Sequence, residues 1–271
     1  VDGAEDIFSG RLEDRLSDEA DVKIVNFGLG GADFFTIKER INNTINFYDT
    51  PDLVIIYSGH NDYTNYYQRS RLNDFFKRFF LITSPPSRIF DSPVQGRGIR
   101  GPFLNLLQGT GLLSFNGSFA DDINEVILEQ FKDNNVEIQK LLAEKDVPLL
   151  YMTTIGNLEA RPFGDIKITE KFYQQGMNTD DHTERITQLK KAMDSEIFTY
   201  DIRAPSEHNE YLRSIDARGI HILDIESELI EDDFNFSHDD FSDYLHFKGS
   251  THRRIAKSLD DYIVEVFLDE P

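Results

Sequence analysis

Short apolar runs alternate with amphipathic stretches along this chain. The apolar runs are nearly continuous, which is typical of strands buried on both faces of a sheet, and they lie at 22–27, 53–57, 147–153 and 220–223. The stretches around these runs repeat their apolar residues at helical spacing, which predicts helices at about 7–16, 33–48, 119–145, 180–196 and 250–268. Strands that are separated by helices need crossover connections, so the pattern predicts an α/β fold with a parallel sheet.

The organisation of the chain favours a single domain. Its 271 residues suit one large domain, and neither an internal repeat nor a linker signature divides them. The one long irregular stretch, at 84–117, is rich in Pro and Gly and lies between the second predicted strand and the long helix. We therefore interpret residues 1–271 as one domain with an insertion at about 63–118.

The composition narrows the possible classes of protein. Asp and Glu number 49 against 28 Lys and Arg, which gives a net charge of −21 and argues against binding to nucleic-acid phosphates. Hydrophobic residues make up 39% and aromatic residues 12%, so the chain is not of the disordered class despite its acidity. The absence of cysteine excludes a disulfide scaffold, a thiolate zinc site and a cysteine nucleophile.

Candidate chemistry lies in the loops that follow the predicted strands, because open parallel sheets bind ligands beyond the carboxyl ends of their strands. The first predicted strand leads into a glycine-rich turn at 28–31, whose backbone N–H groups can be presented to a ligand. The second leads into Gly59-His60-Asn61-Asp62, where the Asn61 amide can donate to an oxyanion. Taken alone, each motif also fits a tight turn or a helix cap.

A third motif precedes the last predicted helix. Asp243-Tyr244-Leu245-His246 places an Asp three residues before a His, so that the carboxylate can fold back on the Nδ1–H of the imidazole. The other ring nitrogen would then serve as a general base. This spacing is weak evidence by itself, and it gains weight from the order of the three motifs along the chain.

In that order and on those elements, the motifs resemble the sequence blocks of the SGNH (GDSL-type) hydrolase superfamily. Gly31 fits the second block, residues 59–62 fit the GxND block, and residues 243–246 fit the DxxH block. The Thr-rich segment at 153–158 is similar to one in a subgroup of larger bacterial SGNH-like domains. The likeness covers residues 1–62, 119–155 and 220–268, whereas 63–118 and 156–219 contain no motif that we can place.

The resemblance implies a three-layer α/β/α domain with a central parallel sheet, of the SGNH or flavodoxin-like kind, and hydrolysis of carboxylic esters by a Ser–His–Asp triad. It makes His246 the general base, Asp243 the group that orients it, and Gly31 with Asn61 the oxyanion donors. It implies no metal or organic cofactor, and the substrate would be a small-molecule, glycan or lipid ester. Acetylated sugars, short acyl esters, lysophospholipids and thioesters all fit such a triad.

Two further residues are candidates for the substrate pocket. His60 lies inside the GxND block, and Asn157 follows the Thr-rich strand end. For His60, a hydrogen-bonded loop histidine without contact to substrate explains the sequence equally well. Both residues are therefore candidates for contact with the substrate in the same cleft.

The block that carries the nucleophilic serine in this family is missing from the chain. The last glycine of that block fits Gly3, so the serine would lie two residues before Val1. The first strand of the sheet would then be missing together with the serine. We expect this chain to be a truncated piece of an SGNH-type esterase or lipase-like hydrolase, inactive as given. The alternative is a catalytically silent SGNH-like domain that binds carbohydrate or lipid. Ser9, Ser17 and Ser58 lie nearby, but none of them occupies the position of the family's serine.

The acidic loop at 238–246 allows a different interpretation. It holds His238, Asp239 and Asp240 beside the DxxH motif, and such side chains suit Zn, Mn or Fe. A metal-dependent phosphoesterase is therefore a third hypothesis. A solvated acidic loop next to a catalytic DxxH motif explains the same residues without a metal, and we favour that explanation.

The segment at 69–100 has the opposite charge to the rest of the chain. It contains seven basic residues against Asp74 and Asp91, and its large apolar residues from Leu72 to Phe80 fall at helical spacing. This apolar face can pack on the sheet while the basic residues pair with acidic neighbours. Alternatively, the segment is a lid or docking element beside Asn61 that contacts an anionic glycan or lipid surface.

Overall fold

The computed structural model describes residues 8–17, 19–47, 50–62, 117–162, 166–195 and 203–268. Its chain divides into two compact units, one made of residues 1–64 with 128–271 and the other of residues 65–127. The described part of the second unit, from residue 117 onward, is helical. The basic segment at 69–100, and the insertion predicted at 63–118 except for its last two residues, lie outside the described residues. The fold below is that of the first unit.

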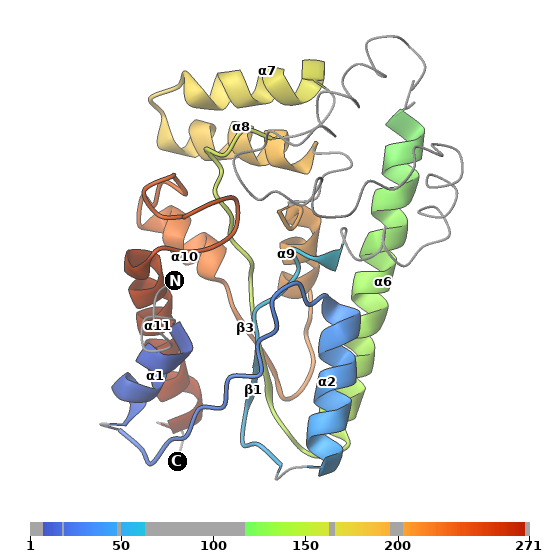
Figure 1. Ribbon diagram of the computed structural model, residues 1–271, viewed down its shortest axis with the longest axis vertical. Coiled ribbons are helices and arrows are strands. Elements are labelled where there is room, and N and C mark those ends of the chain that lie inside the picture. The colour runs from blue at the N-terminus through green and yellow to red at the C-terminus, as the bar shows by residue number, and fades with distance from the viewer. Residues whose placement is uncertain are drawn as a thin grey trace, which may run out of the picture. The chain divides into compact units, whose positions relative to one another are not determined.

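A parallel sheet of three strands forms the centre of this unit (Figure 1). The strands are β1 (Val54–Ile56), β2 (Leu149–Met152) and β3 (Ile220–Leu223), and they lie side by side in the order β1-β2-β3. Each parallel pair is joined through a crossover that contains helix, as the alternating sequence pattern predicts. All four residues of β2 are buried, which explains why its sequence is continuously apolar.

The helices fall on elements that the sequence pattern largely predicts. Their bounds are α1 (Phe8–Leu16), α2 (Phe34–Phe47), α6 (Gly117–Ala143), α7 (Ile166–Met177), α8 (His182–Asp194), α9 (Ser206–Arg213), α10 (Ile225–Glu231) and α11 (Gly249–Ile263), the last continued by the π-helix η3 (Val264–Leu268). Within the described ranges, no helix combines the length and the apolar character needed to cross a bilayer.

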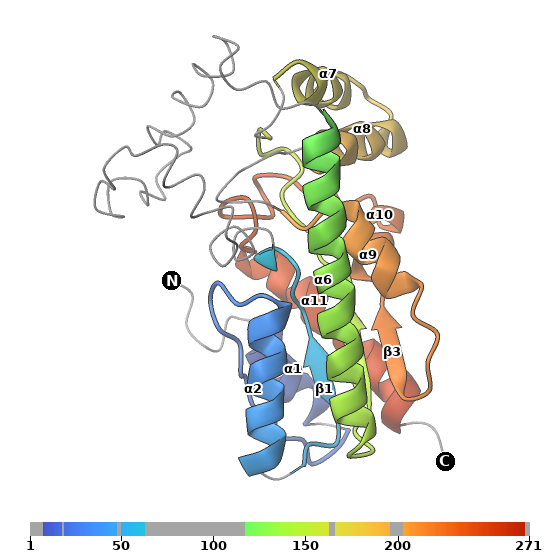
Figure 2. The same ribbon diagram turned by 90° about the vertical axis from the view of Figure 1, so that its right-hand side faces the viewer.

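The two faces of β2 separate the helices into two layers. Leu150 and Met152 point into a core that contains buried residues of α1, α8, α10 and α11. Leu149 and Tyr151, on the other face, pack with buried residues of α2, α6 and α9. Figures 1 and 2 show the same separation, with α1 and α11 on one side of the strands and α2 and α6 on the other. The fold is therefore α/β with three layers, which confirms the predicted fold class.

One predicted strand is wrong. Residues 22–27 adopt no regular secondary structure and pair with none of the three strands of the described sheet. Val22 and Ile24 pack against the core, but Val25 and Phe27 are 56% and 45% exposed, so only part of the apolar run that predicted a strand is buried. The physical reason is that a strand forms where a neighbour satisfies its N–H and C=O groups, and no described strand does so here.

The sequence pattern does not predict three of the helices, namely α7, α9 and α10. α9 and α10 have eight and seven residues, too short for a clear periodicity of apolar positions. A capping signal could have revealed α10, because Asp224 accepts a hydrogen bond from the Ser227 N–H in its first turn at 3.2 Å.

We predict that the stability of this unit depends on the face of β2 that carries Leu150. Leu150 is fully buried, so Leu150→Ala removes apolar contacts and leaves a cavity in the core. This substitution should lower the free energy of unfolding by about 2–5 kcal/mol. Val136→Ala on the exposed side of α6, where Val136 is 39% exposed, is the matched control and should change it by less than about 0.5 kcal/mol. Urea unfolding measures both, and equal effects would contradict the assignment of this core.

Candidate functional site

The loop after β1 is held against the loop after β2. Tyr57 Oη accepts a hydrogen bond from the Ile155 N–H and donates one to the Ile155 carbonyl, both at 3.2 Å. Gly59 then turns the chain with a φ of 146°, in the region of backbone conformation that favours glycine. This turn carries the predicted motif residues His60 and Asn61 past the carboxyl end of β1.

The glycine-rich turn that precedes α2 meets the same loop. Asn61 Nδ2 donates to the Ala32 carbonyl at 3.1 Å, and the Phe34 N–H donates to Asp62 Oδ1 at 3.3 Å. Gly31, just before this contact, has a φ of 78°. The structure therefore brings the first two motifs together, and the roles of Gly31 and Asn61 as oxyanion donors stay predictions.

Asp243 and His246 form a hydrogen-bonded pair, with 2.6 Å between Asp243 Oδ2 and His246 Nδ1. The other carboxylate oxygen accepts from the backbone N–H groups of Leu245 and His246, each at 2.8 Å. Burial raises the pKa of Asp243, but these hydrogen bonds from His246 and Leu245 outweigh it and lower the pKa to about 2. The carboxylate is thus ionised at neutral pH and holds the proton of His246 on Nδ1. The side chain of His246 is 77% exposed.

The turn that contains this pair is fixed to the ends of β1 and β2. Asn157, which is completely buried, donates from Nδ2 to the Asp243 carbonyl and from its backbone N–H to the Tyr244 carbonyl, each at 3.0 Å. Phe247, directly after His246, packs its ring against Tyr57 with 5.6 Å between the centroids. The third motif therefore reaches the same edge of the sheet, and a place for Asn157 in a pocket stays a prediction.

His60 is a hydrogen-bonded loop histidine. Its Nδ1 accepts from the Ala204 N–H at 2.8 Å, so the neutral ring carries its proton on Nε2. Burial lowers the pKa of His60 to about 4; the Ile155 carbonyl opposes this, while the charges of His246 and Arg203 lower the pKa further. His60 is therefore neutral at physiological pH, and its contact with substrate stays a prediction.

Sequence reasoning missed Arg203, which lies in the stretch without recognisable motifs. It is 1% exposed, and its guanidinium donates to the carbonyls of Asn157 and Ala160 and lies 5.7 Å from the centre of the Tyr244 ring. The one local signal is Gly156, where an added Cβ would come within 3.0 Å of Arg203 Cδ. A single glycine in a loop does not reveal which side chain covers it.

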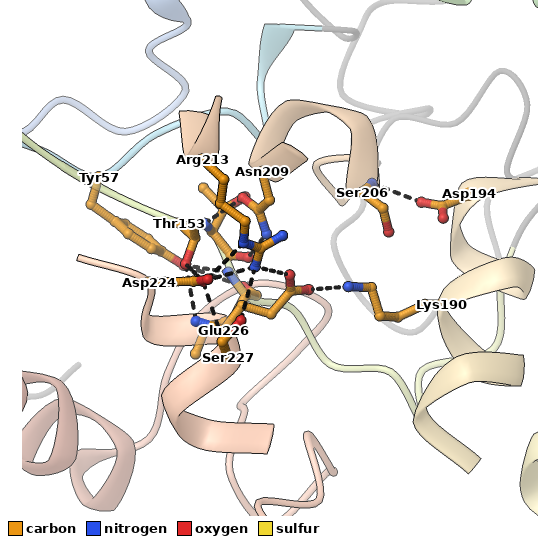
Figure 3. Close-up of polar contacts among 12 residues, drawn as sticks. Tyr57, Thr153, Lys190, Asp194, Ser206, Asn209, Arg213, Asp224, Glu226 and Ser227 are labelled. Carbon is orange, nitrogen blue, oxygen red and sulfur yellow. Dashed lines mark hydrogen bonds and ion pairs between the residues drawn. The ribbon is translucent and has the colours of Figure 1, made fainter. Parts of the chain in front are cut away.

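A cluster of charged side chains at the carboxyl ends of β2 and β3 also escaped prediction (Figure 3). Arg213 donates to both oxygens of Asp224, at 2.6 and 2.7 Å, and to Glu226 at 2.8 Å. Lys190 of α8 reaches Glu226 at 2.8 Å, and Thr153 donates to Asp224 at 3.0 Å. Burial raises the pKa of Asp224, but the hydrogen bonds from Arg213 lower it to about 2. Because buried charges need partners, this cluster fixes α8, α9 and α10 around the sheet edge.

The described residues hold no group of three or more His, Cys, Asp or Glu side chains placed to bind a metal ion. In the loop that prompted the metal hypothesis, His238 Nδ1 lies 2.9 Å from Asn157 Nδ2. Asp240 Oδ2 accepts from both the N–H and the hydroxyl of Ser237, at 3.0 and 2.9 Å. These contacts are those of a hydrogen-bonded turn.

We predict that two buried histidines, His60 and His208, make the stability of the protein sensitive to acid. Burial lowers the pKa of His60 to about 4 and that of His208 to about 3, whereas an unfolded histidine titrates near ~6.5. Below that pH the unfolded chain binds more protons than the folded chain, so the free energy of unfolding falls as the pH drops from about 6.5 to 4. His60 alone should account for about 3 kcal/mol at the lower end of this range.

Urea unfolding at several pH values across this range measures the slope. His60→Asn offers an amide oxygen near the position of Nδ1 to the Ala204 N–H without a titrating ring, so its slope should be shallower than that of the parent. Asp243 and Asp224, with pKa values lowered to about 2, contribute stability that is lost only below about pH 4, outside this range. A parent protein whose stability is constant from pH 6.5 to about 4 would contradict the prediction.

Comparison with known proteins agrees with the first two motifs. The family model of the GDSL-like lipase/acylhydrolase matches residues 3–85, a range that includes Gly31 and the loop at 59–62. No curated protein and no solved structure matches the chain. Lipases and acylhydrolases cleave ester bonds, so the family points to ester hydrolysis in general. The match confirms the predicted resemblance: this chain is similar to the SGNH/GDSL hydrolases.

Proposed function

We propose that this chain supplies the His–Asp pair and the oxyanion donors of an esterase whose nucleophilic serine precedes Val1. The observation that carries the proposal is the 2.6 Å hydrogen bond between Asp243 and His246, in a turn fixed to the ends of β1 and β2. An ionised carboxylate on Nδ1 is the arrangement that prepares the other nitrogen of an imidazole to accept a proton. The family match to lipases and acylhydrolases supports the same chemistry.

In this mechanism His246 Nε2 takes the proton of the serine hydroxyl as its oxygen attacks the ester carbonyl. Asp243 keeps the proton of Nδ1 in place and stabilises the imidazolium that forms. The tetrahedral intermediate collapses when the imidazolium gives its proton to the leaving alcohol, which leaves an acyl-serine. Water, deprotonated by His246, then attacks the acyl group, and the carboxylic acid departs as the serine is regenerated.

The oxyanion of the intermediate would lie against Asn61 and the backbone N–H of Gly31. An amide nitrogen has two hydrogens, and the bond from Asn61 Nδ2 to the Ala32 carbonyl uses one of them and fixes the orientation of the other. Such preorganised donors cost no rearrangement when charge develops. The contact of Asn61 with the turn after Gly31 therefore supports a shared oxyanion hole.

Two features of the first unit support a further strand ahead of Val1. In the described sheet β1 pairs on one side only, with β2. The apolar side chains of Val25 and Phe27 are 56% and 45% exposed, although they belong to the apolar run that predicted a buried strand. A strand added beside β1 would use its unpaired backbone groups and would give these side chains a surface to pack against.

We predict that ester hydrolysis appears when the chain is extended by the residues that its gene encodes before Val1. The extended protein should hydrolyse p-nitrophenyl acetate, and His246→Ala should lower kcat/KM by roughly three orders of magnitude, because the general base is lost. Asn61→Ala should lower it by about 10²-fold through loss of one oxyanion donor. His182→Ala on α8 is the matched histidine control and should leave the rate unchanged.

The outcome separates this proposal from the catalytically silent alternative. An upstream sequence without serine at the expected place, or a folded extended protein without hydrolysis that depends on His246, would contradict the proposed function. A panel of acetyl, longer acyl and sugar esters in the same assay then defines the acyl and alcohol groups that the site accepts.

We also predict that the upstream strand stabilises this unit. Burying Val25 and Phe27 should raise the free energy of unfolding by about 2 kcal/mol or more relative to the 271-residue chain. Amide hydrogen exchange in β1 should slow, because its open side gains a partner, while exchange in β3 should change little. Unchanged exchange in β1 would show that the extension does not pair there.

A further inference from the structure

The pair of Asp243 and His246 has little packing of its own. The side chain of Asp243 is 49% exposed and that of His246 is 77% exposed, so neighbouring side chains cannot fix their geometry by enclosing them. The turn is closed locally by a hydrogen bond from the Ser242 N–H to the His246 carbonyl at 2.8 Å. A small exposed turn of this kind needs an attachment to the fold to hold a fixed direction.

Phe247 attaches the turn to Tyr57 at its far end, and Asn157 attaches the part that carries Asp243 from a buried position. Its Nδ2 and its backbone N–H donate to the two consecutive carbonyls of Asp243 and Tyr244, both at 3.0 Å. Its Oδ1 accepts from the Ala160 N–H at 3.1 Å, which fixes the orientation of the amide. The second hydrogen of Nδ2 points to His238 Nδ1 at 2.9 Å. Both donors that face the turn are therefore held in place by the rest of the fold.

Arg203 holds the backbone of Asn157 in place. Its guanidinium donates to the Asn157 carbonyl, so the backbone on both sides of the Asn157 Cα is engaged. The same guanidinium lies over the ring of Tyr244, the residue between Asp243 and Leu245. Gly156 leaves the space that the Arg203 side chain occupies. The turn is thus attached to the fold by the buried amide of Asn157 and the buried guanidinium of Arg203.

We infer that Asn157, braced by Arg203, is the positioning residue of the Asp243–His246 pair, an inference that rests on the proposed function for its catalytic meaning. Asn157 touches neither the carboxylate nor the imidazole. It acts through the Asp243 and Tyr244 carbonyls, which set where the Asp243 side chain begins and hence where the imidazole points. A misplacement of about 1 Å at a general base is enough to cost roughly 10²-fold in rate.

The experiment uses NMR on the 271-residue chain, where the pair is present whether or not the serine is supplied. Two-bond ¹H–¹⁵N correlations report whether His246 carries its proton on Nδ1 or Nε2, and saturation transfer reports how fast that proton exchanges with water. The variants are Asn157→Ala and the less disruptive Asn157→Ser, whose hydroxyl is too short to reach the Asp243 carbonyl. Asn209→Ala is the matched control, because Asn209 is also a buried amide that holds the backbone after β2, through Thr154.

In both Asn157 variants, His246 should change from the single Nδ1–H form to a mixture of tautomers, and its Nδ1 proton should exchange about tenfold faster or more, since the buried hydrogen bond from the Asn157 side chain to the Asp243 carbonyl is lost. Asn209→Ala should destabilise the protein to a similar degree and leave the His246 signals as in the parent. An unchanged His246 tautomer in the folded Asn157 variants, or an equal change in Asn209→Ala, overturns the inference.

A kinetic arm in the extended protein tests the catalytic meaning separately. Asn157→Ser should lower kcat by about 10- to 100-fold with little change in KM, because orientation of the base is lost and substrate contacts are kept. If the extended protein shows no His246-dependent hydrolysis but the NMR changes occur, the proposed function fails and the positioning role stands. If hydrolysis occurs and kcat of Asn157→Ser is unchanged, the positioning role fails and the function stands.

Discussion

The parallel register of β1, β2 and β3 is the constraint on which the candidate site depends. Because the three strands run in the same direction, Tyr57, Thr153 and Asp224 all lie at one edge of the sheet. The chain must return across the sheet between strands, and the crossovers that contain helix cover both faces. Loops that are far apart in sequence therefore meet at that edge as a consequence of the parallel register alone. The glycine-rich turn and the loop at 59–62 meet there directly, whereas the turn at 243–246 is attached to Asn157 after β2 and, through Phe247, to Tyr57 at the end of β1.

Satisfying polar groups at that edge shapes the rest of the site. Strands end where their backbone groups lose their neighbours, and buried N–H and C=O groups then need other partners. Asn157 and Asn209 fill this need after β2. The side-chain amide of each one donates to a backbone carbonyl and accepts from a backbone N–H. The charged cluster of Arg213, Asp224 and Glu226 does the same after β3. These contacts therefore fix the geometry of the loops that follow β2 and β3.

The sequence alone predicted the parts of this arrangement that follow from periodicity and from motif spacing. The three strands of the sheet, the long helix α6 and the last helix α11 come from apolar patterns that local chemistry strongly constrains. The contact of Asp243 with His246 follows from a separation of three residues. By contrast, the brace of Arg203 on Asn157 joins residues 46 positions apart, and no local pattern encodes such a partner. The error at 22–27 has a related cause, because an apolar run specifies a strand only if a neighbour is available to pair with it.

The exposure of His246 has a consequence for chemical reactivity in solution. A side chain that is 77% exposed can be reached from bulk water by an acylating or alkylating reagent of ordinary size. His60 and His208 present the opposite situation, since burial holds them neutral and removes their rings from such reagents. Covalent labelling under mild conditions should therefore discriminate among the histidines of this chain by depth.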